Sequence, residues 1–221
     1  MQNSFVTDAI NLKSYNLSES DKIIVMYSKD KGLIRGVAKG VKKPKSKLGA
    51  RMDLLVANTL MLHKGRNLDT ICQAEVVNSF YKTRQDIDKI CYSMYVTEVV
   101  NNFGIEEDPC SEVIYNLLYK TLNTISVAEN KVDILLAVIK FQLKMMIESG
   151  FSIELDKCLC CHHVVGDETM YFVPSMGGII CADCASSVHY NKKQLPYKLR
   201  DFFKQMSIND FDERGEYEQK A

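Results

Sequence analysis

The chain has 221 residues, with 28 lysines and arginines and 28 aspartates and glutamates, so its formal net charge is zero. A hydrophobic share of 46% is ordinary for a globular protein. The densest apolar run, ILLAVI at residues 134–139, is far shorter than the ~20 residues of a membrane helix. The first ten residues lack the pattern of a signal peptide, so we expect a cytoplasmic protein with no membrane association.

The charge is unevenly distributed along the chain. Residues 1–85 contain 15 basic and 7 acidic side chains, a net charge of +8. The remaining residues contain 13 basic and 21 acidic side chains, a net charge of −8. This asymmetry indicates an anionic partner for the first part of the chain, either a nucleic acid or a membrane surface.

The first eighty residues have the pattern of β-structure, with short apolar runs separated by turn residues. Five strand candidates lie within VTDAINLKSY, DKIIVMYS, LIRGVAKG, MDLLVANTLMLHKG and LDTICQAEVVNSF. Five short strands in about 80 residues fit a small closed or nearly closed barrel. The edge of a β-sandwich is the alternative, because periodicity alone does not separate the two.

From residue 84 onward the apolar residues follow helical spacing. A first helix is expected to stop at residues 101–104, a second to start at Asp108-Pro109, and a third to span about 130–149. A terminal amphipathic helix is expected at 192–208. Cys72, Cys91 and Cys110 lie singly on apolar patterns, which predicts buried core thiols.

The segment GVAKGVKKPKSKLGAR, residues 36–51, has six basic side chains and no acidic one. With Arg35 just before it and two basic residues in the next turn, the candidate phosphate-binding residues are Arg35, Lys39, Lys42, Lys43, Lys45, Lys47, Arg51, Lys64 and Arg66. Basic loops on one small barrel are a usual way to hold single-stranded nucleic acid. A solvated charged face is the alternative. The nearby aromatic candidates for base stacking are Phe5, Tyr15 and Tyr27, although any of them can instead belong to the core.

Four cysteines near the end of the chain have the spacing of a metal site. Cys158 and Cys161 form one C-x2-C pair, and Cys181 and Cys184 form a second after a gap of 19 residues. Two such pairs can surround one Zn²⁺ tetrahedrally, and with all four positions filled by protein the zinc is structural. The intervening segment, with its Gly-Gly pair, resembles the hairpin of a zinc ribbon. Cys160 and His162 lie close enough to compete for the first pair of positions.

No nucleotide-binding P-loop, G-x-S-x-G or H-E-x-x-H motif is present in the sequence, so we do not expect an enzyme.

The sequence resembles the bacterial recombination mediator family RecO in three stretches, YNLSESDKIIVMYSKDKGLIRGVAKGVKKPKSKLGA, LMLHKGRNLDTICQAEVVNSF and CLCCHHVVGDETMYFVPSMGGIICADCA. The resemblance spans nearly the whole chain and is specific in motif at residues ~15–80 and 158–185.

The resemblance implies an α+β protein. Its parts would be an OB-fold β-barrel at residues 1–80, a helical domain at 81–157 and 185–221, and a four-cysteine zinc ribbon at 158–184 inserted in the helical domain. It also implies a DNA-binding and strand-annealing mediator of recombinational repair. Such proteins bind single- and double-stranded DNA. They work with RecR and often RecF to load RecA on DNA coated by single-strand-binding protein, whose C-terminal tail docks on the helical domain.

Two functions from other classes remain as alternatives. One is a protein-interaction adaptor whose basic loop is only a solvated face. The other is a nucleic-acid-modifying enzyme that uses the ribbon to hold its substrate. The resemblance to RecO also implies a location in the bacterial cytoplasm in association with the nucleoid.

Overall fold

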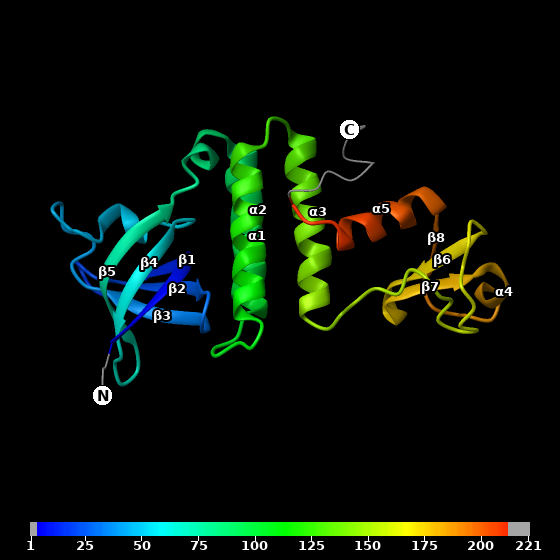
Figure 1. Cartoon of the computed structure of the whole chain (residues 1–221), viewed down its shortest axis with the longest axis horizontal. Coiled ribbons are helices and arrows are strands. Elements are labelled where there is room, and N and C mark those ends of the chain that lie inside the picture. Colours follow the sequence, from blue (N-terminus) through cyan, green and yellow to red (C-terminus); the bar gives the residue numbers. More distant parts are fainter. Residues whose placement is uncertain (1–3, 212–221) are drawn as a thin grey trace. The chain divides into compact units, whose positions relative to one another are not determined.

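The computed structural model describes residues 4–211 and contains two compact units. The first unit ends at Phe141 and the second begins at Gln142. Figure 1 shows the strands and helices of both units in chain order. No helix within residues 4–211 is both long and apolar enough to span a bilayer.

The first unit begins with a closed five-stranded barrel, with strands in the order β1-β2-β3-β5-β4 (Figure 1). Antiparallel pairing of β1 with β4 and a short parallel pairing of β3 with β5 close it. This closed arrangement is the OB-fold that the sequence predicts. The strands are β1 (Ser4–Asn16), β2 (Lys22–Ser28), β3 (Gly32–Ala38), β4 (Ala57–His63) and β5 (Asp69–Asn78).

The barrel interior is filled by alternate residues of its strands, because successive side chains of a strand point to opposite faces. Ile24 and Met26 from β2 and Leu60 and Leu62 from β4 are fully buried there. The segment between β3 and β4 also contributes to this core with Val41, Leu48 and Met52, the last in the short 3-10 helix η1 (Gly49–Met52). The basic segment is therefore packed onto the barrel.

Two helices follow the barrel in the same unit, after a 3-10 helix, η2 (Tyr81–Gln85). Helix α1 (Ile87–Phe103) begins where Asp86 accepts hydrogen bonds from the N–H groups of Asp88 and Lys89, and it ends at Gly104 as predicted. Helix α2 (Ser111–Val127) begins later than predicted. The side chain of Asp108 accepts a hydrogen bond from the N–H of Cys110 at 2.8 Å. Residues 108–110 therefore form a turn that precedes the helix.

Helix α3 (Lys131–Glu148) runs across the division between the units. The second unit contains a three-stranded sheet in the order β7-β6-β8. Its elements are β6 (Met170–Val173), the 3-10 helix η3 (Pro174–Met176), β7 (Gly178–Cys181), α4 (Ala182–Ala185), β8 (Lys193–Leu195) and α5 (Tyr197–Ile208). Gly177, with a φ of 72°, makes the turn before β7.

The structure corrects two expectations. The start of the predicted terminal helix is strand β8, because Leu195 precedes Pro196 and a residue before proline favours the extended conformation. Of the single cysteines, Cys72 and Cys91 are exposed and Cys110 is half-buried, so none of the three is a buried core thiol. Cys72 follows the inward-facing Ile71 and therefore lies on the outer face of β5.

The predicted domain boundaries at residues 80, 158 and 184 stay a prediction, since the two compact units divide the chain elsewhere. The last ten residues of the predicted helical domain, 212–221, lie outside the described part of the chain.

Candidate metal centre and nucleic-acid interface

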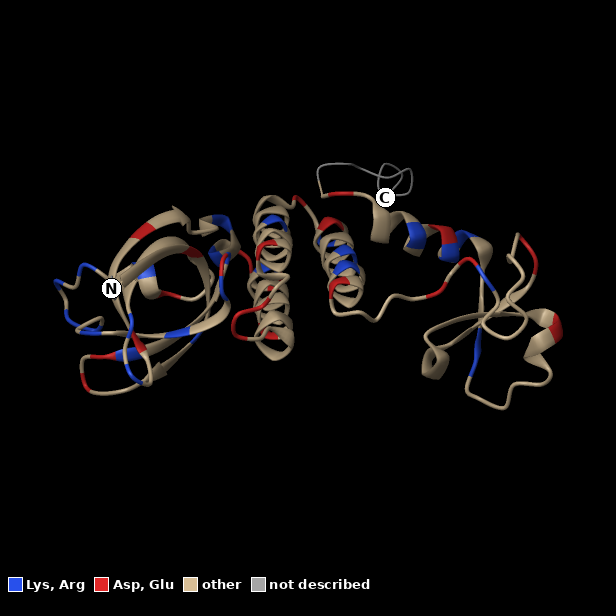
Figure 2. Cartoon of the chain, turned by 60° about the horizontal axis from the view of Figure 1, so that its bottom comes forward, with Lys and Arg blue, Asp and Glu red and all other residues tan. Residues whose placement is uncertain are grey.

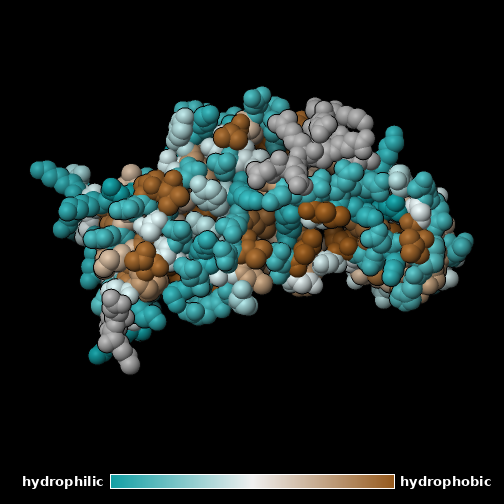
Figure 3. Space-filling model, in the orientation of Figure 1, coloured by the Kyte–Doolittle hydropathy of each residue, from teal (hydrophilic) through white to brown (hydrophobic). Residues whose placement is uncertain are grey.

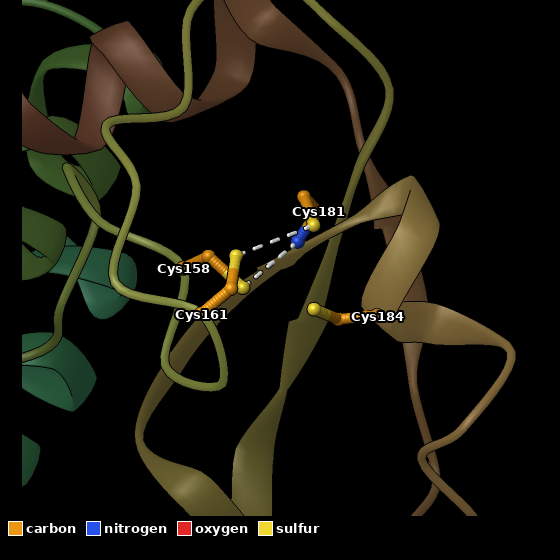
Figure 4. A group of neighbouring side chains, drawn as sticks. All are labelled: Cys158, Cys161, Cys181 and Cys184. Carbon is orange, nitrogen blue, oxygen red and sulfur yellow. Dashed lines mark hydrogen bonds between the residues drawn. The ribbon is translucent and has the colours of Figure 1, made fainter.

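Four cysteine side chains converge in the second unit (Figure 4). Cys158 and Cys161 lie in the loop before β6, Cys181 ends β7, and Cys184 lies in α4. Their sulfur atoms all lie within 4.8 Å of one another, and those of Cys161 and Cys181 are 3.9 Å apart. Tetrahedral coordination with metal–sulfur bonds of about 2.3 Å requires sulfurs about 3.8 Å apart. These four side chains can therefore hold one metal ion.

The backbone around Cys158 forms a tight turn that presents its sulfur. The N–H of His162 donates to the carbonyl of Cys158, and the N–H of Cys158 donates to the carbonyl of His163, both at 2.9 Å. His162 has a φ of 61°, in the left-handed region that such turns need. The N–H of Cys181 points at the Cys158 sulfur at 3.4 Å, which ties the two cysteine pairs together.

The thiols influence one another strongly. Burial opposes ionisation of Cys158, but N–H donors from Cys161, Cys181 and Cys160 outweigh it and lower the pKa of this thiol to about 6. Hydrogen bonding to the thiols of Cys181 and Cys161 raises the pKa of Cys184 far above its usual value. Four thiolates cannot accumulate side by side without a cation, so the donor set suits a thiophilic dication.

Cys160 and His162 are exposed, and neither belongs to the group of converging sulfurs within the described chain. The structure therefore brings together the C-x2-C pairs predicted from spacing.

The imidazole of His163, which the sequence interpretation did not propose as a site residue, lies beside the cysteine cluster. Its Nδ1 lies 3.0 Å from the Cys161 sulfur, and its Nε2 lies 2.7 Å from Glu168. Glu168 raises the pKa of this imidazole.

The basic segment between β3 and β4 lies at the end of the barrel shown at the left of Figure 2. Every basic side chain predicted within it is exposed, namely Lys39, Lys42, Lys43, Lys45, Lys47 and Arg51. Its apolar residues Val41, Leu48 and Met52 are buried. We call residues 39–51 the basic loop.

The first end of the basic loop is fixed to the β1–β2 turn. The N–H of Gly40 donates to Oδ1 of Asp21 at 2.7 Å, and the N–H of Lys42 donates to the carbonyl of Ser20 at 3.0 Å. The Gly40 N–H, together with the Ser20 hydroxyl, lowers the pKa of Asp21. The Nζ of Lys42 donates to the carbonyl of Ser18 at 2.9 Å.

The second end of the basic loop is held by two buried asparagines that the sequence interpretation did not single out. Asn11 donates to the carbonyls of Arg51 and Asp53, both at 2.8 Å. Asn58 donates to the same Arg51 carbonyl at 2.9 Å. Both asparagine side chains are fully buried. The backbone of the loop is thus positioned at both ends, while its charges face outward.

The remaining candidate phosphate ligands lie elsewhere on the barrel. Lys64 and Arg66 are exposed in the β4–β5 turn. Arg35, on β3, is exposed but forms an ion pair with Glu106 in the α1–α2 loop, at 2.7 Å. Arg35 and Lys64 also line one cavity. The structure therefore divides the predicted set into the basic loop and a second group beside this cavity.

The aromatic candidates separate by burial. Tyr27 is fully buried and donates to Asp108 at 2.8 Å; burial and this hydrogen bond raise its pKa far above the usual value. Tyr27 is therefore a core residue. Tyr15 is 49% exposed, with the Lys13 ammonium 5.6 Å from its ring centroid. Phe5 is partly buried against the barrel core. On the face in Figure 3, apolar side chains of the barrel appear as separate patches among hydrophilic ones.

Comparisons with known proteins cover almost all of this chain. Residues 1–80 match the family described as "Recombination protein O N terminal", and residues 84–218 match "Recombination protein O C terminal". The chain is 34% identical to a "DNA repair protein RecO" of Desulforamulus reducens over 179 residues, which is 81% of this chain and 68% of that protein. It is 33% identical to proteins of the same name from Dehalococcoides mccartyi, over 83% of this chain and 71% of the relative, and from Rubrobacter xylanophilus, over 80% and 70%.

Proposed function

The chain belongs to the RecO family of DNA repair proteins, and from that premise we propose that it is a non-enzymatic mediator that binds DNA through its barrel and anneals complementary strands. The observation that carries the proposal is the basic loop: six exposed cationic side chains of one sign on a backbone that is fixed at both ends. A solvated charged face does not require its backbone to be fixed in this way.

The proposed mechanism is electrostatic. Lysines and arginines of the basic loop, with Arg35, Lys64 and Arg66, neutralise phosphates and release counterions. Neutralising the phosphates of two strands lowers the repulsion that opposes their pairing. Because these contacts are to phosphates, binding is tolerant of sequence and includes both single- and double-stranded DNA.

We propose that the ion held by Cys158, Cys161, Cys181 and Cys184 is a single structural Zn²⁺. Four thiolates in tetrahedral arrangement are the donor set that zinc prefers, and they fill every coordination position, which leaves none for a substrate. When bound, the ion neutralises part of the thiolate charge and links the loop before β6 to β7 and α4.

For partners, we propose the set implied by the family: RecR, RecF in some settings, and the C-terminal tail of single-strand-binding protein during loading of RecA. The family resemblance implies that this tail ends in Phe, and a cavity of about 80 Å³ in the second unit has apolar lining residues that suit such a side chain. It lies between the end of α3 and α5, and Leu143, Met146, Ile147 and Phe203 are among its apolar lining residues. We place the protein in the bacterial cytoplasm with the nucleoid.

An annealing assay tests the proposal directly. Two complementary, fluorescently labelled strands should pair faster with the protein than without it, and faster at low than at high salt. Incubation of each labelled strand with the protein and with several divalent metal ions should leave the length of the strand unchanged. Cleavage or covalent modification would favour the nucleic-acid-modifying enzyme instead. Binding to RecR without any binding to DNA would favour the adaptor.

A further inference from the structure

A cavity of about 280 Å³ opens on the first unit beside β3. Its walls come from the start of β1, the start of β3, the β4–β5 turn and the α1–α2 loop. Apolar side chains contribute to it, namely Phe5, Leu33, Ile34 and Leu68. Its volume is slightly below the range typical of drug-sized ligands, so it suits a smaller, single-ring or double-ring group.

The charges around the cavity are balanced. Three basic side chains, Lys31, Arg35 and Lys64, face three acidic ones, Asp69, Glu106 and Glu107. Lys31 pairs with Glu107 at 3.2 Å and Arg35 with Glu106 at 2.7 Å. A phosphate inside the cavity would lie beside three carboxylates as well as three cations, so it gains less there than along the basic loop, which contains no acidic residue. A neutral ring with hydrogen-bonding edges fits both the polar rim and the apolar walls.

The wall formed by the α1–α2 loop is rigidly attached to the barrel. The N–H of Leu33 donates to the Ile105 carbonyl at 2.9 Å, and the N–H of Glu107 donates to the Lys31 carbonyl at 2.8 Å. A side chain at Gly32 would place its Cβ 2.4 Å from the Ile105 carbonyl oxygen, so only glycine permits this approach. The cavity is therefore formed before any ligand arrives, which lowers the entropic cost of filling it.

The location of the cavity relates it to the proposed DNA contacts. Arg35 and Lys64 belong both to the cavity lining and to the candidate phosphate ligands. From Arg35 the chain continues through β3 directly into the basic loop at Lys39, a path of about 13 Å in extended conformation. A single strand whose phosphates lie on these residues passes the mouth of the cavity.

We propose that this cavity holds one unstacked nucleobase of bound single-stranded DNA, a subsite that rests on the proposed DNA-binding function. Apolar contacts with Phe5 and Leu68 cover the base, and Asn67 and the charged rim meet its polar edge. Bases in a duplex are stacked and cannot enter. The subsite therefore adds a preference for single strands that phosphate contacts alone do not supply.

The test compares two oligonucleotides of equal length and charge, one of thymidines and one made entirely of abasic residues. Wild-type protein should bind the thymidine strand roughly five- to tenfold more tightly at the same salt concentration. Asn67→Trp, which fills the cavity mouth without changing charge, should abolish this difference. Gln73→Trp is the matched control, since Gln73 is an exposed amide on β5 outside the cavity lining, and it should keep the difference.

The outcomes separate the subsite from the function on which it rests. Equal affinity of wild-type protein for the two strands, or an unchanged preference in Asn67→Trp with circular dichroism showing a folded protein, overturns the base subsite alone. Binding to neither strand overturns both proposals. If Asn67→Trp does not fold, crosslinking of an iodouracil-containing strand to wild-type protein decides the question. Crosslinks to Phe5 or to residues 64–69 support the subsite, and crosslinks only to residues 39–51 overturn it.

Discussion

The Oδ1 atom of Asp21 accepts a 2.7 Å hydrogen bond from the backbone N–H of Gly40, which has a φ of 64°. This contact joins the β1–β2 turn to the first residues of the basic loop. Together with Asn11 and Asn58 at the other end, it holds the backbone while the lysine side chains face outward. We regard this arrangement as the feature that prepares the loop for phosphates.

Replacing Asp21 by Ala should therefore weaken DNA binding without removing any positive charge. The loop would have to be ordered on binding, so the dissociation constant for a single strand should rise several-fold, while the dependence on salt stays nearly the same. Fluorescence anisotropy measures both quantities. Glu19→Ala is the matched control, because Glu19 is an exposed acidic residue of the same turn. Equal effects of the two substitutions would contradict this role of Asp21.

The Asp21 contact should also depend on pH. The hydrogen bond from the Gly40 N–H is the largest of the effects that lower the pKa of Asp21 below its ordinary value of 3.8. A carboxyl group with a lowered pKa contributes its stabilisation above the unfolded-state value and loses it as pH falls through the folded-state value. Slow hydrogen exchange at the Gly40 amide should thus persist down to about pH 4 and be lost below it, before global unfolding. Protection lost already at neutral pH would show that the contact does not persist in solution.

Changing the metal site should affect the second unit selectively. Cys181→Ser should release the metal and make residues 153–203 sensitive to protease, because the four cysteines connect the loop before β6 with β7 and α4. Cys160→Ser is the control, since Cys160 is exposed and outside the cluster. Mass spectrometry under native conditions should find one zinc in wild type and in Cys160→Ser. Retention of zinc by Cys181→Ser would refute the four-cysteine assignment.

The ion pair between Arg35 and Glu106 should restrain DNA binding slightly. Glu106→Gln leaves Arg35 available to a phosphate, so affinity should rise about two- to threefold and the salt slope should steepen by up to about 0.7. Glu112→Gln is a suitable comparison, because Glu112 pairs with Lys29, which is not among the proposed phosphate ligands. Weaker DNA binding by Glu106→Gln would mean that the pair positions Arg35 for DNA rather than competing with it.

The apolar cavity of the second unit should bind the tail of single-strand-binding protein. Met146→Glu places a charge at an exposed edge of this cavity, so a synthetic tail peptide should bind at least tenfold more weakly. Binding of naked DNA should not change. Val164→Glu is the control, at a valine of the same unit that is 68% exposed and outside the cavity lining. Equal peptide binding by the two variants would place the tail elsewhere.

The sequence predicts the parts of this protein that depend on local pattern. Short apolar runs separated by turn residues indicate the barrel strands, and the C-x2-C pairs indicate the four converging cysteines, because both signals lie in nearby residues of the chain. Gly104 likewise marks the end of α1, where the backbone becomes extended with a φ of −67° and a ψ of 143°. Attention to alternation would also have placed Cys72 on the outer face of β5, next to the inward Ile71.

Features that depend on distant parts of the chain were not predicted. Asn11 holds the basic loop through carbonyls some forty residues away, and Arg35 pairs with a residue 71 positions away. Nothing in the local sequence distinguishes these asparagine and glutamate residues from solvent-exposed ones. The cavity beside β3 was missed for the same reason, since its walls come from four separate segments.

The most direct test of the account is a salt titration of binding to single-stranded DNA with Lys42, Lys43, Lys45 and Lys47 all changed to Glu. Affinity should fall by at least a hundredfold at low salt, and the slope of log affinity against log salt should flatten by about 3. The control reverses four exposed lysines outside the barrel, Lys131, Lys157, Lys193 and Lys198, which gives the same net charge. An unchanged affinity and slope in the loop variant, or an equal loss in the control, would contradict the assignment of the basic loop as the DNA-binding site.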